Sequence, residues 1–157
     1  AMFVYGADFF LFKPGILLLL VGSLLTFPLS LGPITLGPVT LSLHWMLLGL
    51  ALSVLGLQSV FLGGLSQVLS DFSGRKLPLW NAVFSYNRAV LISVILFCVG
   101  LGLDLSFFAE YAREGFKLAS GLPPASYRAV TGILLIIGGF QYFSFTLMHH
   151  LILKRLK

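Results

Sequence analysis

The sequence is short of charge. Charged residues make up only 10% of its 157 positions, and the stretch from 14 to 70 contains no Lys, Arg, Asp or Glu. Two more uncharged stretches run from 89 to 103 and from 129 to 153. Because about a quarter of the residues in a soluble domain are charged, this composition excludes that class. The first stretch is no signal peptide, since it lacks a basic start and a small-residue cleavage site and continues into a second apolar span.

The sequence also lacks the residues on which catalysis depends. Its one cysteine, Cys98, rules out a disulfide framework and is interpreted as a packed apolar residue. No carboxylate lies at the centre of an apolar span, where proton-coupled transporters usually keep an ionisable residue. We find no glycine-rich phosphate loop, no acidic metal-binding pair and no nucleophile beside a base. The chain alone is therefore expected to hold no catalytic site and no cofactor.

What the sequence does have is long apolar runs, and they predict four membrane helices. The predicted spans are 14–31, 44–69, 88–108 and 128–151, each close to the length of about 20 residues that crosses a bilayer. Between the first two, glycine–proline pairs break any helix, and the segment from Ile34 to Leu43 alternates like a short β-ribbon.

A repeat runs through these spans. One constant offset along the chain carries Gly49 onto Gly132, and it also carries the triplet 56–58 onto 139–141, so that Gly-Leu-Gln returns as Gly-Phe-Gln. Such a repeat indicates that one helical hairpin has been used twice. It also relates the two copies by an axis along the membrane normal.

The predicted fold class is therefore all-α integral membrane protein. A single membrane domain, 1–157, is expected to contain one hairpin at 14–69, a cytoplasmic interfacial loop at 70–87 and a second hairpin at 88–151.

Small and polar residues inside the spans are expected to pack helices together. The candidates are Gly49, Gly56, Gly63, Gly132, Gly139, Gln58 and Gln141. Small residues at a seven-residue spacing let helix backbones approach closely. The glutamines could contact a lipid-borne phosphate or sugar, but an interhelical hydrogen bond, for example between Gln58 and Gln141, is the commoner use.

Lys and Arg residues are distributed unequally between the two sides. One side has seven of them: Lys13, Arg75, Lys76, Arg88, Lys154, Arg155 and Lys157. The other side has three: Arg113, Lys117 and Arg128. The positive-inside rule then predicts that both termini and the central loop are cytoplasmic. Because these cations flank apolar spans, lipid headgroups are better partners for them than nucleic acid.

Two connecting segments are predicted to be amphipathic. Apolar residues recur near helical spacing after Lys76, which predicts an interfacial helix with the Trp80 indole at headgroup level. The segment 105–120 mixes aromatic and charged residues on the outer side. The three histidines are also interpreted as interfacial, since the adjacent His149 and His150 would diverge by about 100° on a helix and make a poor metal pair.

A set of cations is a candidate site for an anionic headgroup. The residues are Arg75, Lys76, Arg88, Lys154 and Arg155. Near a membrane surface, each would contribute roughly 1 kcal/mol to the free energy of binding an anionic headgroup. The alternative interpretation is that they only set the topology.

Several segments resemble the C-terminal membrane domain of bacterial family 2 glycosyltransferases. They are 43–49 (Leu-His-Trp-Met-Leu-Leu-Gly), 55–63 (Leu-Gly-Leu-Gln-Ser-Val-Phe-Leu-Gly), 74–78 (Gly-Arg-Lys-Leu-Pro), 86–88 (Tyr-Asn-Arg) and 139–145 (Gly-Phe-Gln-Tyr-Phe-Ser-Phe). These enzymes are similar to polyprenyl-phosphate and dolichyl-phosphate hexose synthases. The resemblance covers most of the chain, from about residue 10 to the end.

The resemblance implies a role in anchoring sugar transfer from a nucleotide donor to a polyprenyl phosphate at the cytoplasmic face of the bacterial inner membrane. A separate catalytic domain would then be a partner and would hold the divalent metal, and the chain resembles an excised or separately encoded membrane domain. Two other functions stay open: a free-standing flippase for lipid-linked sugars, and a structural four-span scaffold. Membrane lipids and a second copy of the chain are further expected partners.

Overall fold

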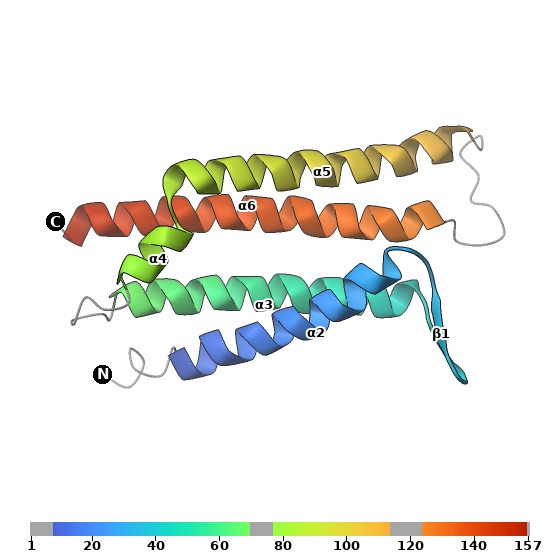
Figure 1. Cartoon of the computed structure of the whole chain (residues 1–157), viewed down its shortest axis with the longest axis horizontal. Helices are drawn as coiled ribbons and strands as arrows, with labels where there is room; N and C mark the ends of the chain where they lie inside the picture. The colour runs from blue at the N-terminus through green and yellow to red at the C-terminus, as the bar shows by residue number, and fades with distance from the viewer. Residues whose placement is uncertain (1–7, 70–76, 114–123, 157) are drawn as a thin grey trace.

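The protein is a helical membrane protein that also contains one small β-hairpin. The computed structural model describes residues 8–69, 77–113 and 124–156. Within these ranges, four helical segments are long and apolar enough to cross a membrane, and they correspond to α2 (Lys13–Leu29), α3 (Leu43–Leu69), α5 (Tyr86–Arg113) and α6 (Pro124–Leu156). The first of these segments, Phe10–Leu29, also includes the end of the short element before α2. The shorter elements are η1 (Asp8–Phe12), β1 (Ile34–Leu36), β2 (Val39–Leu41) and α4 (Leu77–Val83). The predicted fold class is confirmed (Figure 1).

Helix boundaries differ most from the prediction in the second hairpin. The third span was predicted to end at 108, but α5 continues to Arg113, so the first part of the expected amphipathic segment 105–120 extends the same helix. The rest of that segment lies outside the described residues. The fourth span begins at Pro124 rather than 128, because proline at the first helical position loses no hydrogen bond and already has a helical φ.

The predicted β-ribbon is confirmed. Strands β1 and β2 pair antiparallel with Ile34 opposite Leu41 and Thr35 opposite Thr40. Gly37 turns the chain between them with a φ of 60°, a left-handed conformation that glycine adopts without steric cost.

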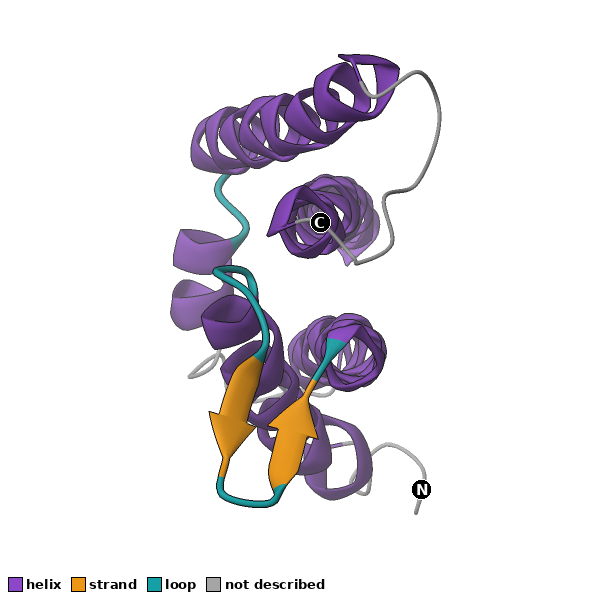
Figure 2. Ribbon diagram, turned by 90° about the vertical axis from the view of Figure 1, so that its right-hand side faces the viewer, coloured by secondary structure: helices purple, strands orange, loops and turns teal. Residues whose placement is uncertain are grey.

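The four spans pack in the order α2, α3, α6, α5. Helix α2 begins, α6 ends and α4 lies at one end of the bundle, which we call the α4 end (Figure 1). The β-hairpin and the start of α6 lie at the other end, which we call the hairpin end (Figure 2).

The first hairpin is held by glycines on both helices. A Cβ added to Gly56 would lie 2.7 Å from Leu19 Cα, and one added to Gly49 would lie 2.7 Å from Thr26 Oγ1. On α2, a Cβ at Gly22 would lie 2.6 Å from the Gly49 carbonyl oxygen. Each spacing is too short for a side chain, so α2 and α3 approach to backbone contact.

The second hairpin repeats these contacts. A Cβ added to Gly132 on α6 would lie 2.7 Å from the Gly100 carbonyl oxygen. The equivalent distance in the first hairpin, from a Cβ added to Gly49 to the Gly22 carbonyl oxygen, is 3.0 Å. Gly139 likewise meets Ser93, while its counterpart Gly56 meets Gly15.

The offsets that relate the two hairpins are not the same for all helices. The offset that carries Gly49 onto Gly132 holds between α3 and α6. Helices α2 and α5 correspond by a smaller offset, which carries Gly15 onto Ser93 and Gly22 onto Gly100. Between equivalent positions, the segment that joins α5 to α6 is therefore longer than the segment that joins α2 to α3.

The hairpins do not meet through equivalent faces. A Cβ on Gly138 would lie 3.7 Å from the Leu57 side chain, which marks the contact of α6 with α3. A twofold axis would require Phe140 and Leu55 to make the matching contact, yet these side chains are 68% and 55% exposed. The two hairpins are therefore not related by an exact twofold rotation, although they run in the same direction (Figure 1) and the contacts inside each hairpin repeat.

We predict that Gly56→Ala destabilises the first hairpin by about 1–3 kcal/mol, because the added methyl group meets the α2 backbone rather than a flexible side chain. The matched control is Gly102→Ala, at an exposed α5 position with no atom within 4 Å of the new Cβ. That change should be neutral or slightly stabilising, since alanine is the better helix former. Thermal unfolding in detergent measures both variants. Equal stability of the two would contradict the close contact.

Candidate functional site: the α4 end

Helix α4 is bound to α3 by its tryptophan. The Trp80 ring lies against Gly64, where an added Cβ would be 2.6 Å from the ring atom Cζ3. Its Nε1 donates a hydrogen bond of 3.1 Å to Gln67 Oε1. The glycine leaves space for the indole, and the Gln67 amide accepts its one polar hydrogen. Helix α3 therefore provides a complementary packing site for α4.

Helix α4 is bound to α6 by a tyrosine and by contacts between aromatic rings. The Tyr142 hydroxyl donates to the carbonyl oxygen of Val83, the last residue of α4. Phe84, directly after α4, is fully buried, and its ring centroid lies 5.6 Å from that of Trp80 and 5.1 Å from that of His149. The described part of the connection between the hairpins, from residue 77 onwards, is thus packed into the bundle.

One aromatic cluster joins the two hairpins here. Phe61 of α3 contacts Tyr142 and Phe145 of α6, with ring centroids 5.8 Å and 5.2 Å apart, and it contacts Phe84 at 5.6 Å. Aromatic pairs at such distances contribute about 0.5–1.5 kcal/mol each beyond the area they bury. The aromatic cluster fixes where the α4 end of the second hairpin sits against the first.

The Trp80 indole, which was expected at headgroup level, is not exposed to lipid headgroups. Trp80 is 4% exposed, because Gly64 and Gln67 offer it space and a hydrogen-bond acceptor inside the protein. The other tryptophan, Trp45, is 44% exposed and begins α3 at the hairpin end.

The interfacial interpretation of the histidines is wrong for His149. That side chain is 1% exposed, and neither ring nitrogen has a hydrogen-bond partner within the described residues. His44 and His150 are exposed, and His150 Nδ1 donates to the Thr146 carbonyl oxygen at 3.0 Å. Across the described ranges no three His, Cys, Asp or Glu side chains form a group that could hold a metal ion.

The predicted headgroup cations are placed only in part. Arg88 lies at the start of α5 and Lys154 near the end of α6, and both side chains are exposed at the α4 end, as is Lys13 at the start of α2. Arg155 belongs to α6, but its side chain is not described, and Arg75 and Lys76 lie outside the described residues. The described cations thus come from three different helices.

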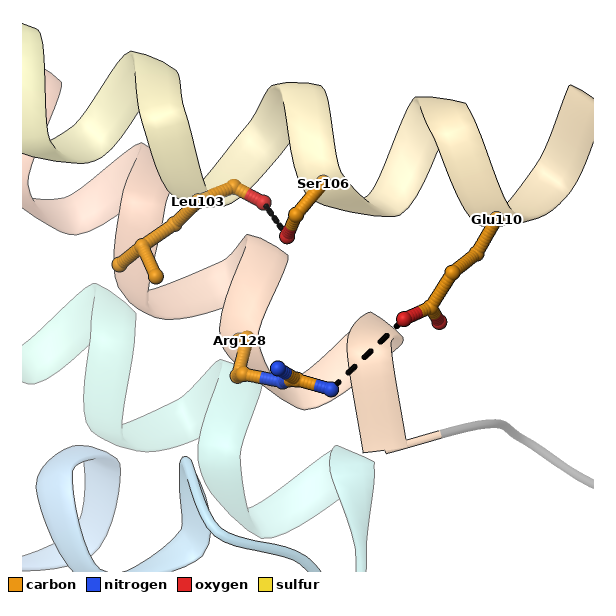
Figure 3. A network of polar contacts seen from close by, with 4 residues as sticks. All are labelled: Leu103, Ser106, Glu110 and Arg128. Atoms are coloured by element: carbon orange, nitrogen blue, oxygen red, sulfur yellow. Dashed lines mark hydrogen bonds and ion pairs between the residues drawn. The ribbon is translucent and has the colours of Figure 1, made fainter.

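The hairpin end has a different charge pattern. Arg128 of α6 and Glu110 of α5 form an ion pair with 3.8 Å between Nη2 and Oε1 (Figure 3). Both side chains are about half exposed, so the pair adds at most about 1 kcal/mol. Asp104 lies one to two turns before Glu110 on the same helix. Arg128 at this end therefore has an acidic partner on α5.

The two glutamines are not paired as the sequence suggested. Gln141 Oε1 is buried and accepts no hydrogen bond within the described part of the chain. Gln58 is exposed on the outer surface of α3, and it too makes no hydrogen bond to a described residue. The expected bond between them is absent, because the two hairpins contact each other through other faces.

A comparison with known protein families identifies the family to which this helical bundle belongs. The family model of the glycosyltransferase family 2 C-terminal transmembrane region matches residues 67–153, which is more than half of the chain. The chain belongs to this family. No curated protein and no solved structure matches it.

The matched region begins near the end of α3 and covers α4, α5 and nearly all of α6. Of the segments that carried the resemblance, 74–78, 86–88 and 139–145 lie within the match, whereas 43–49 and 55–63 lie before it. The family region therefore contains α4 and the rings of α6 that bind it, but the Trp80 contact at Gly64 lies just outside.

We predict that Trp80 is shielded from lipid while Trp45 is not. The chain has two tryptophans, so Trp45→Phe and Trp80→Phe each leave one fluorescent indole. Phospholipids brominated along the acyl chain or at the headgroup should quench Trp45 strongly and Trp80 weakly, because the latter is enclosed by protein. Strong quenching of Trp80 by a headgroup-level bromine would restore the interfacial interpretation and contradict the packed α4.

Proposed function

We propose that this protein is the membrane-anchoring domain of a glycosyltransferase that transfers sugar from a nucleotide donor to a polyprenyl phosphate. The α4 end faces the cytoplasm of a bacterium, where the catalytic domain works, and the domain positions the lipid acceptor at that face. Family membership supports the class of enzyme. The observation that carries the role is the α4 end, where the packed α4 brings together helix ends that carry exposed cations.

The geometry of the α4 end suits an acceptor with an anionic headgroup. Arg88 and Lys154 extend from neighbouring helices, since α5 packs along α6. Cations at a membrane surface attract an anionic headgroup by roughly 1 kcal/mol each, while the isoprenoid tail stays in the hydrocarbon beside the apolar helices. Because α4 is fixed by Trp80 and Tyr142, Arg88, which lies at the start of α5 directly after it, has a rigid base.

The orientation can be tested with single cysteines. In a Cys98→Ser background, Thr40→Cys places a thiol on the exposed β2 strand, and Asn87→Cys places one on the exposed start of α5. A membrane-impermeant maleimide added to intact spheroplasts should label the variant at 40 and not the one at 87. Opening the membrane should make both react. The reverse labelling would place the α4 end outside and contradict the proposed role.

Acceptor binding can be tested by neutralising cations at either end. The triple variant Arg75→Gln, Arg88→Gln and Lys76→Gln should weaken polyprenyl phosphate binding by about 100-fold, from roughly 1 kcal/mol per cation. A matched triple on the side predicted to face away from the cytoplasm is Arg113→Gln, Lys117→Gln and Arg128→Gln, which removes the same charge. Native mass spectrometry against a neutral lipid of the same tail length measures both.

The matched variant should bind as the natural chain does, and added salt should weaken binding to the natural chain as the first triple does. Equal affinity of all three proteins for polyprenyl phosphate and for the neutral lipid would reduce these cations to topology signals.

A further inference from the structure

One polar side chain lies exposed where a bilayer has no water. Gln58 is near the middle of α3, roughly 22 Å from one end of the helix and roughly 16 Å from the other at 1.5 Å per residue. Its side chain therefore cannot extend to either headgroup layer. No described residue forms a hydrogen bond with it, and hydrocarbon offers none. Because an unsatisfied polar group in hydrocarbon is costly, we expect this amide to form a hydrogen bond with a group outside its own chain.

The surface around Gln58 has the spacing of a helix-packing seam. Leu48, Leu55 and Leu62 follow one another at seven residues, and each is between 40% and 55% exposed. Ala51 and Gln58 occupy the positions three residues after the first two leucines and are also exposed. These five residues, the Gln58 seam, form the alternating three- and four-residue pattern by which two helices interlock side chains.

The seam faces away from the described helices that pack against α3. Gly49, Gly56 and Gly63 turn to α2 and η1, and Leu57 and Phe61 turn to α6. Gln58 is about 200° from Gly56 around the helix, so it lies on a third side. Apolar exposure alone would be explained by lipid, but lipid cannot satisfy the amide.

We infer that α3 pairs with α3 of a second copy of this chain through the Gln58 seam, with the two Gln58 amides hydrogen-bonded to each other at mid-membrane. Copies inserted in a membrane share one orientation, so the two α3 helices run parallel and each Gln58 meets its counterpart at the same depth. An amide carries both a donor and an acceptor, so two glutamines related by a twofold axis complement each other. One polar residue in an apolar seam also fixes register, because any slip leaves both amides without a partner.

The test uses the intact chain in its native membrane with Cys98→Ser as background. Leu55→Cys and Leu62→Cys place a thiol on the seam, and Phe140→Cys places one at a more exposed position on α6, where the repeat puts the equivalent of Leu57. An oxidant should produce crosslinked dimers from the two seam variants and few from the third. Equal crosslinking at all three positions would show random collision and overturn the pairing.

The hydrogen bond itself is tested by Gln58→Leu, with Gln141→Leu as matched control because it removes the same group at the equivalent position of α6. Gln58→Leu should weaken dimerisation about 3- to 30-fold, the range found for hydrogen bonds between membrane helices. Energy transfer between labelled copies in bilayers measures the dimer equilibrium. Gln141→Leu should leave it unchanged.

Gln58→Asn keeps the amide and should restore most of the dimer. Because Gln58 contacts no described residue through a hydrogen bond, Gln58→Leu is expected to fold normally, and an unchanged unfolding temperature confirms it. A monomer in every variant, or an equal effect of the two leucine substitutions, would overturn the inference.

Discussion

Close backbone contact at glycine is the interaction on which this structure depends. Inside a bilayer, burying apolar surface between helices gives little advantage, because lipid tails are as apolar as leucine. The helices of each hairpin must therefore be held together by close packing contacts that lipid tails cannot form. Gly22 with Gly49 and Gly100 with Gly132 bring backbones together in both hairpins, and this explains why the same contacts recur while the residues around them differ.

The hairpins are joined by a different means. Between α3 and α6 the spacing is ordinary, and aromatic rings around Phe61 and Phe84 fill the α4 end. Helix α4 completes this junction through one hydrogen bond to each hairpin, from Trp80 and from Tyr142. A family region that begins just before α4 thus includes the element that fixes one hairpin on the other, next to the cations proposed to meet the acceptor.

The sequence alone predicted the parts of the fold that depend on local pattern. Absence of charge located the spans, and the repeated Gly-x-Gln triplet found the glycines of α3 and α6. The matching repeat in α2 and α5 was missed, since of the two contacting pairs of small residues only Gly22 and Gly100 share a residue type, whereas Gly15 corresponds to Ser93. Burial of Trp80 and His149 could not be foreseen either, because the groups that enclose them come from other helices and a tryptophan near basic residues is typical of an interface.

Photocrosslinking with a polyprenyl phosphate that carries a diazirine next to the phosphate tests the central claim, that the α4 end receives the acceptor. After irradiation of the protein in membranes, mass spectrometry locates the modified peptides. We expect labels in α4, at the start of α5 and at the end of α6, and fewer labels when unlabelled polyprenyl phosphate competes. Labels in the β-hairpin or around the pair of Arg128 and Glu110, or labels spread evenly along the helices, would contradict it.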